Sequence, residues 1–92
     1  MSRYLAIKNF VLDKKTSCRW FVDKRWAGEQ VGQEIRINPK TEIVPAICHE
    51  TIHALFPDFK EKEVEAMEEA TLEKLTKLQA IILLKIFVRK AR

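Results

Sequence analysis

The chain has 92 residues and a mass of 10.8 kDa, which leaves room for one domain with one small core and excludes a fold large enough to hold a dinucleotide. Hydrophobic residues make up 47% and charged residues 33% of the chain, with only 2 Gly and 3 Pro, a composition that excludes a disordered protein. The formal net charge of +4 would suit a nucleic-acid binder. The excess lies mainly in residues 74–92, where it also suits the negative end of a helix, so the distribution disfavours a nucleic-acid partner.

Cysteine use and hydropathy bear on the compartment. Cys18 and Cys48 lie far apart and form no CxxC pair, which is too few for a disulfide scaffold. The N-terminal residues are interrupted by basic side chains and lack the pattern of a signal peptide. The longest apolar run, residues 80–84, is far shorter than the ~20 residues that span a bilayer. We therefore expect a cytoplasmic protein without a membrane span.

The first part of the chain, up to Pro39, has the pattern of short strands. Leu5–Leu12 alternates apolar and polar residues and predicts a first strand, although its beginning could be a short helix. Cys18–Val22 and Glu34–Asn38 predict a second and a third strand. Trp26–Gly32 contains both glycines of the chain and predicts a loop.

After Pro39 the spacing becomes helical. Thr41 is a plausible N-cap for a helix from about Glu42 to Phe56, which Pro57-Asp58 would end. A second helix, beginning near Phe59, carries apolar residues at intervals of three and four. The expected fold is therefore α+β, with a small antiparallel three-stranded sheet followed by helices in one domain over residues 1–92.

The C-terminal segment, residues 80–92, is apolar on all sides from Ile81 to Leu84 and again from Ile86 to Val88. A single projecting helix would leave these side chains in water. We expect a bend near Lys77–Gln79, after which the segment completes the monomer's core, covers the functional cleft as a latency segment, or pairs with a second copy.

The chemistry is concentrated in residues 49–53, an HExxH motif. A spacing of four places His49 and His53 on one face of a helix, where two ring nitrogens can bind one Zn²⁺. Glu50 points about 100° away from His49 around the helix and can act as the base for a water activated by zinc. The alternative is a helix with two surface histidines and an incidental glutamate. His49 and His53 are the only histidines in the chain, which favours the metal site.

The third ligand must come from another residue type. The metzincin pattern is excluded because it needs a third histidine. Cys48 is poorly placed as a ligand, because it lies in the apolar stripe that it forms with Val44, Ile52 and Leu55 on one side of the helix. A carboxylate on the following acidic helix is left. Helix geometry and distance from His53 rank Glu61 first, followed by Glu65 and Glu68.

The HExxH helix, the glutamate on the next helix and the small preceding sheet resemble the catalytic core of gluzincin metallopeptidases, and the short chain is similar to the minigluzincins. The segment CHETIHALFPDF with the following KEKEVE also resembles small ImmA-like peptidases. These resemblances imply a zincin-like, zinc-dependent peptidase that is often latent. Matched residue by residue, they give Glu61 the third-ligand role and Glu65 a supporting or alternative ligand role.

We therefore predict a zinc metallopeptidase acting on peptide or protein substrates, with His49, His53 and Glu61 as metal ligands and Glu50 as catalytic base. The strand Glu34–Asn38 would offer an edge to an extended substrate. Arg36 is a candidate for stabilising the oxyanion, although a solvent-facing position is the stronger expectation. The rival functions are a zinc-stabilised binding or regulatory module without turnover and a nucleic-acid binder using the basic tail.

Overall fold

The computed structural model describes residues 2–21 and 28–91, and these form four helices and three strands. In chain order the elements are α1 (Arg3–Leu12), β1 (Ser17–Trp20), β2 (Gly28–Val31), β3 (Glu34–Ile37), α2 (Ile43–Leu55), α3 (Glu61–Lys74) and α4 (Lys77–Lys90). The predicted α+β class is confirmed.

The sheet is mixed rather than antiparallel, which corrects our prediction. Its strand order is β1-β3-β2, with β1 parallel and β2 antiparallel to β3. The expected loop over residues 26–32 is wrong for Gly28–Val31, which forms β2, whereas Gly32 does lie in a turn and residues 26–27 lie outside the described part. Gly32 has φ of 60° and opens a two-residue turn into β3, the position at which a tight hairpin requires glycine. The glycines therefore bound a strand.

The predicted first strand, Leu5–Leu12, is also wrong, because the segment lies in α1. Ser2 caps this helix, since its hydroxyl oxygen accepts the backbone N–H of Leu5. Ile7 and Val11 lie one turn apart and are both buried in the core. The predicted second and third strands correspond to β1 and β3, although Val22 lies outside the described residues.

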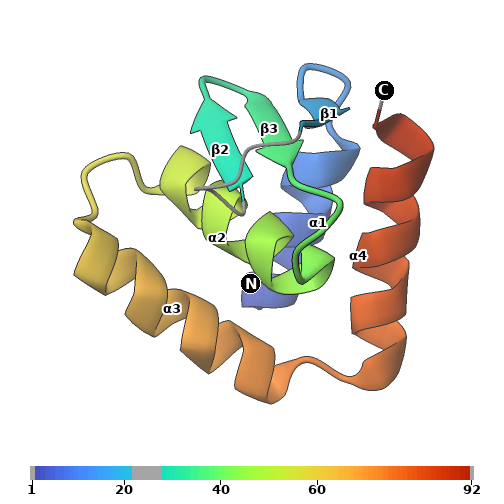
Figure 1. Cartoon of the computed structure of the whole chain (residues 1–92). Coiled ribbons are helices and arrows are strands. Elements are labelled where there is room, and N and C mark those ends of the chain that lie inside the picture. Colours follow the sequence, from blue (N-terminus) through green and yellow to red (C-terminus); the bar gives the residue numbers. More distant parts are fainter. Residues whose placement is uncertain (1, 22–27, 92) are drawn as a thin grey trace.

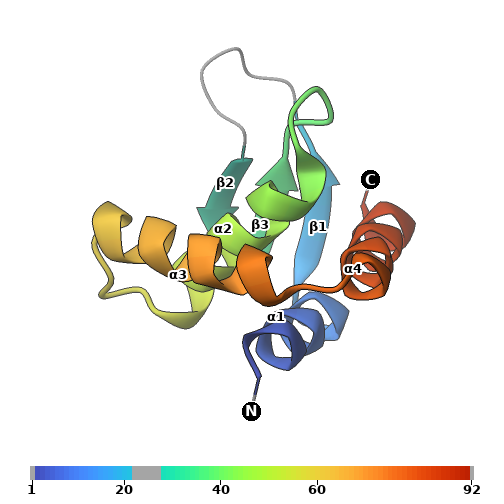
Figure 2. The ribbon, with the colours of Figure 1, turned by 90° about the horizontal axis from the view of Figure 1, so that it is seen from below.

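Helix α2 lies at the centre of the fold and contacts α1, α3, α4 and the strands β2 and β3 (Figures 1 and 2). The helix predicted from Glu42 to Phe56 is confirmed within one residue at each end. Glu42 rather than Thr41 holds the N-cap position, and the Thr41 hydroxyl instead donates to the carbonyl of Asn38. Ile47, Cys48 and Ile52 of α2 are almost completely buried, and both cysteines of the chain are free and buried.

The helical C-terminal half is broken where Leu75 and Thr76 separate α3 from α4, just before the predicted bend. Thr76 and Gln79 form a reciprocal capping box, because each side chain accepts the backbone N–H of the other residue. Helix α4 then packs against α1, α2 and β1, and its Leu83 and Phe87 are fully buried. The segment therefore completes the monomer's own core.

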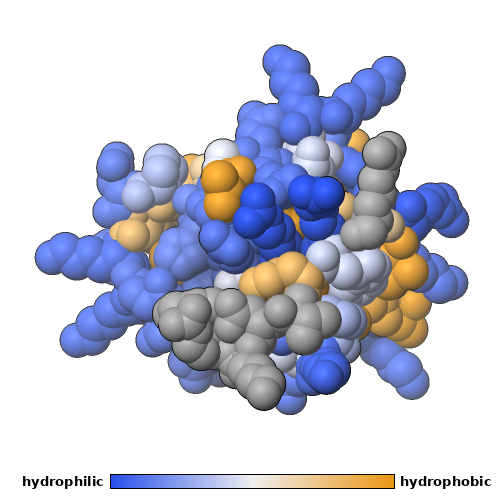
Figure 3. Space-filling view, turned by 45° about the horizontal axis from the view of Figure 1, so that its top comes forward, coloured by the Kyte–Doolittle hydropathy of each residue, from blue (hydrophilic) through white to orange (hydrophobic). Residues whose placement is uncertain are grey.

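One face of α4 stays in contact with solvent. Leu78 is 66%, Ile81 37% and Val88 50% exposed, and Figure 3 shows apolar residues gathered along the side of the molecule where α4 lies. The expected self-association through this segment stays a prediction. No described helix is long and apolar enough to cross a membrane.

The end of α4 is joined to the beginning of the chain by a polar anchor. The Lys90 ammonium donates to the carbonyl oxygens of Val11, Asp13 and Thr16 at 2.6, 2.9 and 2.9 Å. These bonds use all three of its donors and satisfy carbonyls at the end of α1 and directly before β1. Beside this anchor, the ring of Phe87 meets Trp20 of β1 edge to face, with centroids 5.0 Å apart.

We expect Phe87→Ala to lower the free energy of unfolding by about 3–5 kcal/mol, because it removes a fully buried ring and leaves a cavity. Val88→Ala, at the next position but half exposed, is the control and should change stability by no more than about 0.5 kcal/mol. Urea denaturation followed by circular dichroism measures both. Equal effects would contradict the placement of α4 in the core.

Candidate metal centre

The two histidines of the HExxH motif lie on one face of α2, as their spacing predicts. Their Nε2 atoms are 3.2 Å apart, and both side chains are partly buried, with 20% of His49 and 26% of His53 exposed. Two ligand atoms held at 2.0–2.1 Å from a tetrahedral zinc ion stand about 3.3 Å apart. The separation of the two ring nitrogens therefore fits a shared metal ion.

Glu61, the first residue of α3, brings its carboxylate to the same point. Its Oε1 lies 2.7 Å from His49 Nε2, and its Oε2 lies 3.0 Å from His53 Nε2. The ligand atoms of these three residues all fall within 4.8 Å of one another. Two imidazole nitrogens and one carboxylate oxygen are a donor set that zinc accepts, with a fourth position free for water or substrate.

The approach of Glu61 depends on the link between α2 and α3. The backbone N–H of Phe56 closes α2 on the carbonyl of Ile52, and the rings of Phe56 and Phe59 then stack with centroids 4.7 Å apart. Glu63 accepts the backbone N–H of Lys60 and fixes the start of α3. These local contacts place Glu61 at the C-terminal end of α2, beside His53.

Glu68 lies beside His49 but outside the group of His49, His53 and Glu61, and thus not in the ligand position that we considered for it. Its Oε1 lies 2.6 Å from Nδ1 of His49, the ring nitrogen that points away from Glu61. A proton on Nδ1 donated to this carboxylate leaves Nε2 with its lone pair free to bind a metal. The sequence contained an indication that Glu68 lies on the side of α3 that faces the histidines, because residues seven apart, such as Glu61 and Glu68, share one face of a helix.

Glu65, the predicted supporting or alternative ligand, lies on the exposed part of α3. Among the described contacts, the carboxylates that reach the histidines belong to Glu61 and Glu68. The structure thus brings together His49, His53, Glu61 and Glu68.

Glu50 lies in the wall of a cavity of about 340 Å³ beside His49, and only 8% of the residue is exposed. The cavity is lined by residues of β2, α2 and α3, and α4 contributes none of its described lining residues. A Cβ placed on Gly28 of β2 would come within 3.0 Å of Glu50 Cγ and 3.3 Å of its Oε2. Glycine at position 28 therefore leaves the space that the Glu50 carboxylate occupies, a role that the sequence did not reveal.

The electrostatics of the cavity suit a proton acceptor. Burial raises the pKa of Glu50 from its ordinary value of 4.5 to about 7, and the charges of Glu61, Glu29 and Glu68 act in the same direction, partly offset by His49. Burial works to lower the pKa of His49, but the hydrogen bond to Glu68 and the nearby carboxylates outweigh it and raise that pKa. A carboxylate with a pKa near neutrality is well matched to general-base catalysis at neutral pH.

Arg36, our candidate for oxyanion stabilisation, does not face this cavity. Its guanidinium forms ion pairs with Glu34 and Glu29. The residues before and after it on β3, Ile35 and Ile37, are fully buried in the core. Since side chains alternate along a strand, Arg36 lies on the outer face of the sheet. The prediction that Arg36 faces solvent is therefore the better one.

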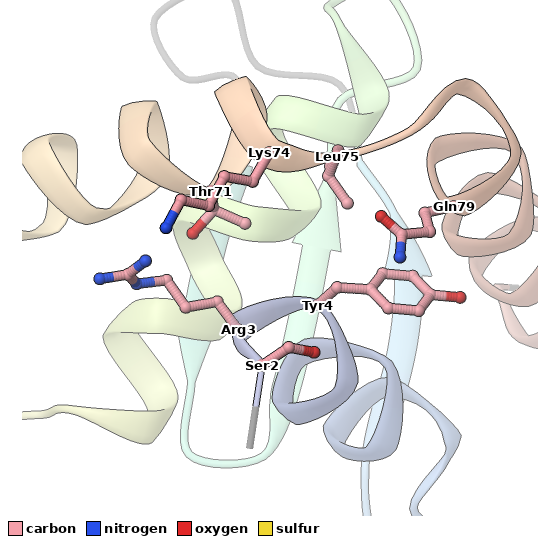
Figure 4. A pocket seen from close by; sticks show the side chains of 7 residues that line it. All are labelled: Ser2, Arg3, Tyr4, Thr71, Lys74, Leu75 and Gln79. Atoms are coloured by element: carbon pink, nitrogen blue, oxygen red, sulfur yellow. The ribbon is translucent and has the colours of Figure 1, made fainter.

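A separate cavity of about 480 Å³ lies between the start of α1 and the junction of α3 and α4 (Figure 4). Leu75 points into it, Tyr4 and Gln79 face each other on one side, and Arg3 and Lys74 extend toward the other. None of the HExxH residues lines it.

Comparisons of the chain with family models, with curated proteins and with solved structures give no match. The chemistry of the site therefore carries the functional argument.

We expect the protein to bind one equivalent of zinc, and Glu61→Ala to weaken that binding by at least about 100-fold, since loss of a ligand should exceed the 10–100-fold cost of losing a supporting carboxylate. Glu65→Ala, one turn further along α3 and exposed, is the matched control and should leave the affinity unchanged. Competition with a chromogenic chelator measures the affinities. A larger loss for Glu65→Ala would contradict this ligand set.

We also expect Glu50→Gln to stabilise the chelator-treated protein at alkaline pH. The pKa of Glu50 is higher in the folded than in the unfolded chain. Ionisation of Glu50 therefore costs the fold no free energy below pH 4.5, and it destabilises the fold increasingly as the pH rises from 4.5 through 7. The variant should gain roughly 3 kcal/mol over the wild type at pH 8 and less than about 1 kcal/mol at pH 5. Melting temperatures at the two pH values measure this, with the exposed Glu69→Gln as control. A difference that does not depend on pH would contradict the raised pKa.

Proposed function

We propose that the protein is a zinc-dependent peptidase of the gluzincin type. One observation carries the proposal: two imidazole nitrogens and the Glu61 carboxylate meet at one point beside the buried carboxylate of Glu50, at the wall of a cavity. A metal site that only stabilised the fold would hold its ion with a fourth protein ligand, and it would not require a base beside the ion. Here His49, His53 and Glu61 offer three ligands, and the carboxylate of Glu50 lies beside them as a base.

Each side chain has a defined task in the proposed reaction. A bound zinc ion would supply Lewis acidity for the peptide carbonyl and lower the pKa of water. Glu50 accepts a proton as the water oxygen bonds to the carbonyl carbon, and it returns that proton to the nitrogen as the C–N bond breaks. Water is thereby added across the peptide bond, and Glu50 ends in its starting state. Glu68 holds the ring of His49 in the tautomer that leaves Nε2 free.

The sheet offers a place for the main chain of a substrate, but on a different strand from the one predicted. The expected strand, β3, is central and pairs with β1 and β2 on its two sides. In the described sheet β2 pairs with β3 alone, and Gly28 at its start lines the cavity of Glu50. The outer edge of β2 is therefore suited to pair with an extended peptide in front of the site.

We expect zinc-loaded wild-type protein to cleave a fluorogenic peptide library, and Glu50→Gln to lower kcat by at least about 100-fold while it keeps one equivalent of zinc, because the variant loses proton transfer and no ligand. Glu69→Gln, on the exposed side of α3, should keep full activity.

The same experiment separates the rival function. Wild-type protein that binds zinc, gains stability from it and cleaves no peptide would indicate a zinc-stabilised binding module. Cleavage that persists in Glu50→Gln would show that another group is the base.

A further inference from the structure

The cavity beside the HExxH motif is strongly acidic, although the whole chain has a net charge of +4. Its walls include the carboxylates of Glu42, Glu50 and Glu68, and none of its described lining residues is lysine or arginine. The local charge is therefore opposite in sign to that of the protein, and a cavity of about 340 Å³ can hold one extended side chain.

Glu50 indicates that this cavity receives a ligand. Only 8% of the residue is exposed, and no hydrogen bond or ion pair joins its carboxylate to another described residue, while its oxygens still have access to the cavity. Leaving a buried carboxylate without a partner is costly unless a ligand or solvent in the cavity satisfies it.

Most carboxylates near the cavity already have a partner. Glu61 contacts both histidines, and Glu68 is hydrogen-bonded to His49. Glu29, whose charge also acts on Glu50, forms an ion pair with Arg36. Glu42 is the N-cap residue of α2, but its side chain makes no capping hydrogen bond and is exposed at the cavity wall. With Glu50 used for proton transfer, Glu42 is the carboxylate left to meet a charge on the substrate.

We propose that this cavity binds a cationic group of the peptide substrate, an ammonium or guanidinium next to the cleaved bond, with Glu42 as its counter-charge. The inference rests on the proposed peptidase function and names its substrate class. A lysine or arginine side chain and a free N-terminal amine offer the same chemistry, and the experiment distinguishes them.

The first test compares cleavage of peptides that differ only in charge. Zinc-loaded protein should cleave a peptide with lysine beside the scissile bond with a kcat/KM at least about 10-fold above that of its norleucine analogue, an uncharged side chain of similar length. The preference should fall about 10-fold in Glu42→Gln through a higher KM for the lysine peptide, and it should persist in Glu69→Gln. N-acetylation distinguishes the sources, because it lowers kcat/KM for the lysine and the norleucine peptide alike only where the terminal amine is bound.

A second measurement does not depend on turnover. Titration of zinc-loaded Glu50→Gln protein with N-acetyl-lysine amide should shift the backbone NMR signals of Gly28 and Ala46, and N-acetyl-norleucine amide should not. If no peptide is cleaved but these shifts occur, the peptidase function fails and the cationic pocket stands.

Two results would overturn the inference. One is equal cleavage of the lysine and norleucine peptides with no effect of N-acetylation, together with equal NMR shifts for the charged and uncharged amides. The other is a second equivalent of bound zinc that is lost in Glu42→Gln, because the acidic walls would then serve a metal ion.

Discussion

The contact of Glu61 with both imidazole rings joins α2 to α3, and the geometry of the site depends on it. This contact is too exposed to hold the helices together alone, since 58% of the Glu61 side chain is in solvent and exposed ion pairs contribute roughly 0–1 kcal/mol. Burial of Val64, three residues later and fully enclosed, contributes about 1.5–3 kcal/mol. Apolar packing therefore positions α3, and Glu61 reaches the histidines because Val64 is anchored.

The site concentrates negative charge at a cost to the fold. Glu50, Glu61 and Glu68 lie around one imidazole, and their mutual repulsion opposes folding wherever they are ionised. A divalent cation at the two histidines would relieve this repulsion. The same arrangement that disfavours the folded chain thus favours metal binding, which links stability to the chemistry of the site.

The sequence predicted the local features of the site better than the arrangement of the strands. His49, Glu50 and His53 follow from a spacing of four in one helix, and the rank of Glu61 follows from distance along the chain. Leu5–Leu12 was misjudged because its alternation hid the spacing of Ile7 and Val11, which share a helical face. The parallel pairing of β1 with β3 is a contact between distant segments, which no local pattern encodes.

The close approach of Gly28 to Glu50 is likewise a contact between segments distant in the sequence. A glycine in a sequence indicates a turn more often than a close approach, and only the position of α2 shows that Glu50 needs the space. For Glu68, the seven-residue spacing from Glu61 gave the shared face, but the ring nitrogen that it meets depends on how α3 crosses α2.

The Lys90 anchor has a consequence for how the molecule folds. Its three hydrogen bonds join residues 74 to 79 positions apart, so they close almost the whole chain into a loop. Closing such a loop costs entropy before the contacts repay it, and contacts of this range slow folding. During synthesis, the β1 side of the core is completed only when α4 has emerged, so the helices that carry the candidate metal ligands emerge before the fold that supports them is complete.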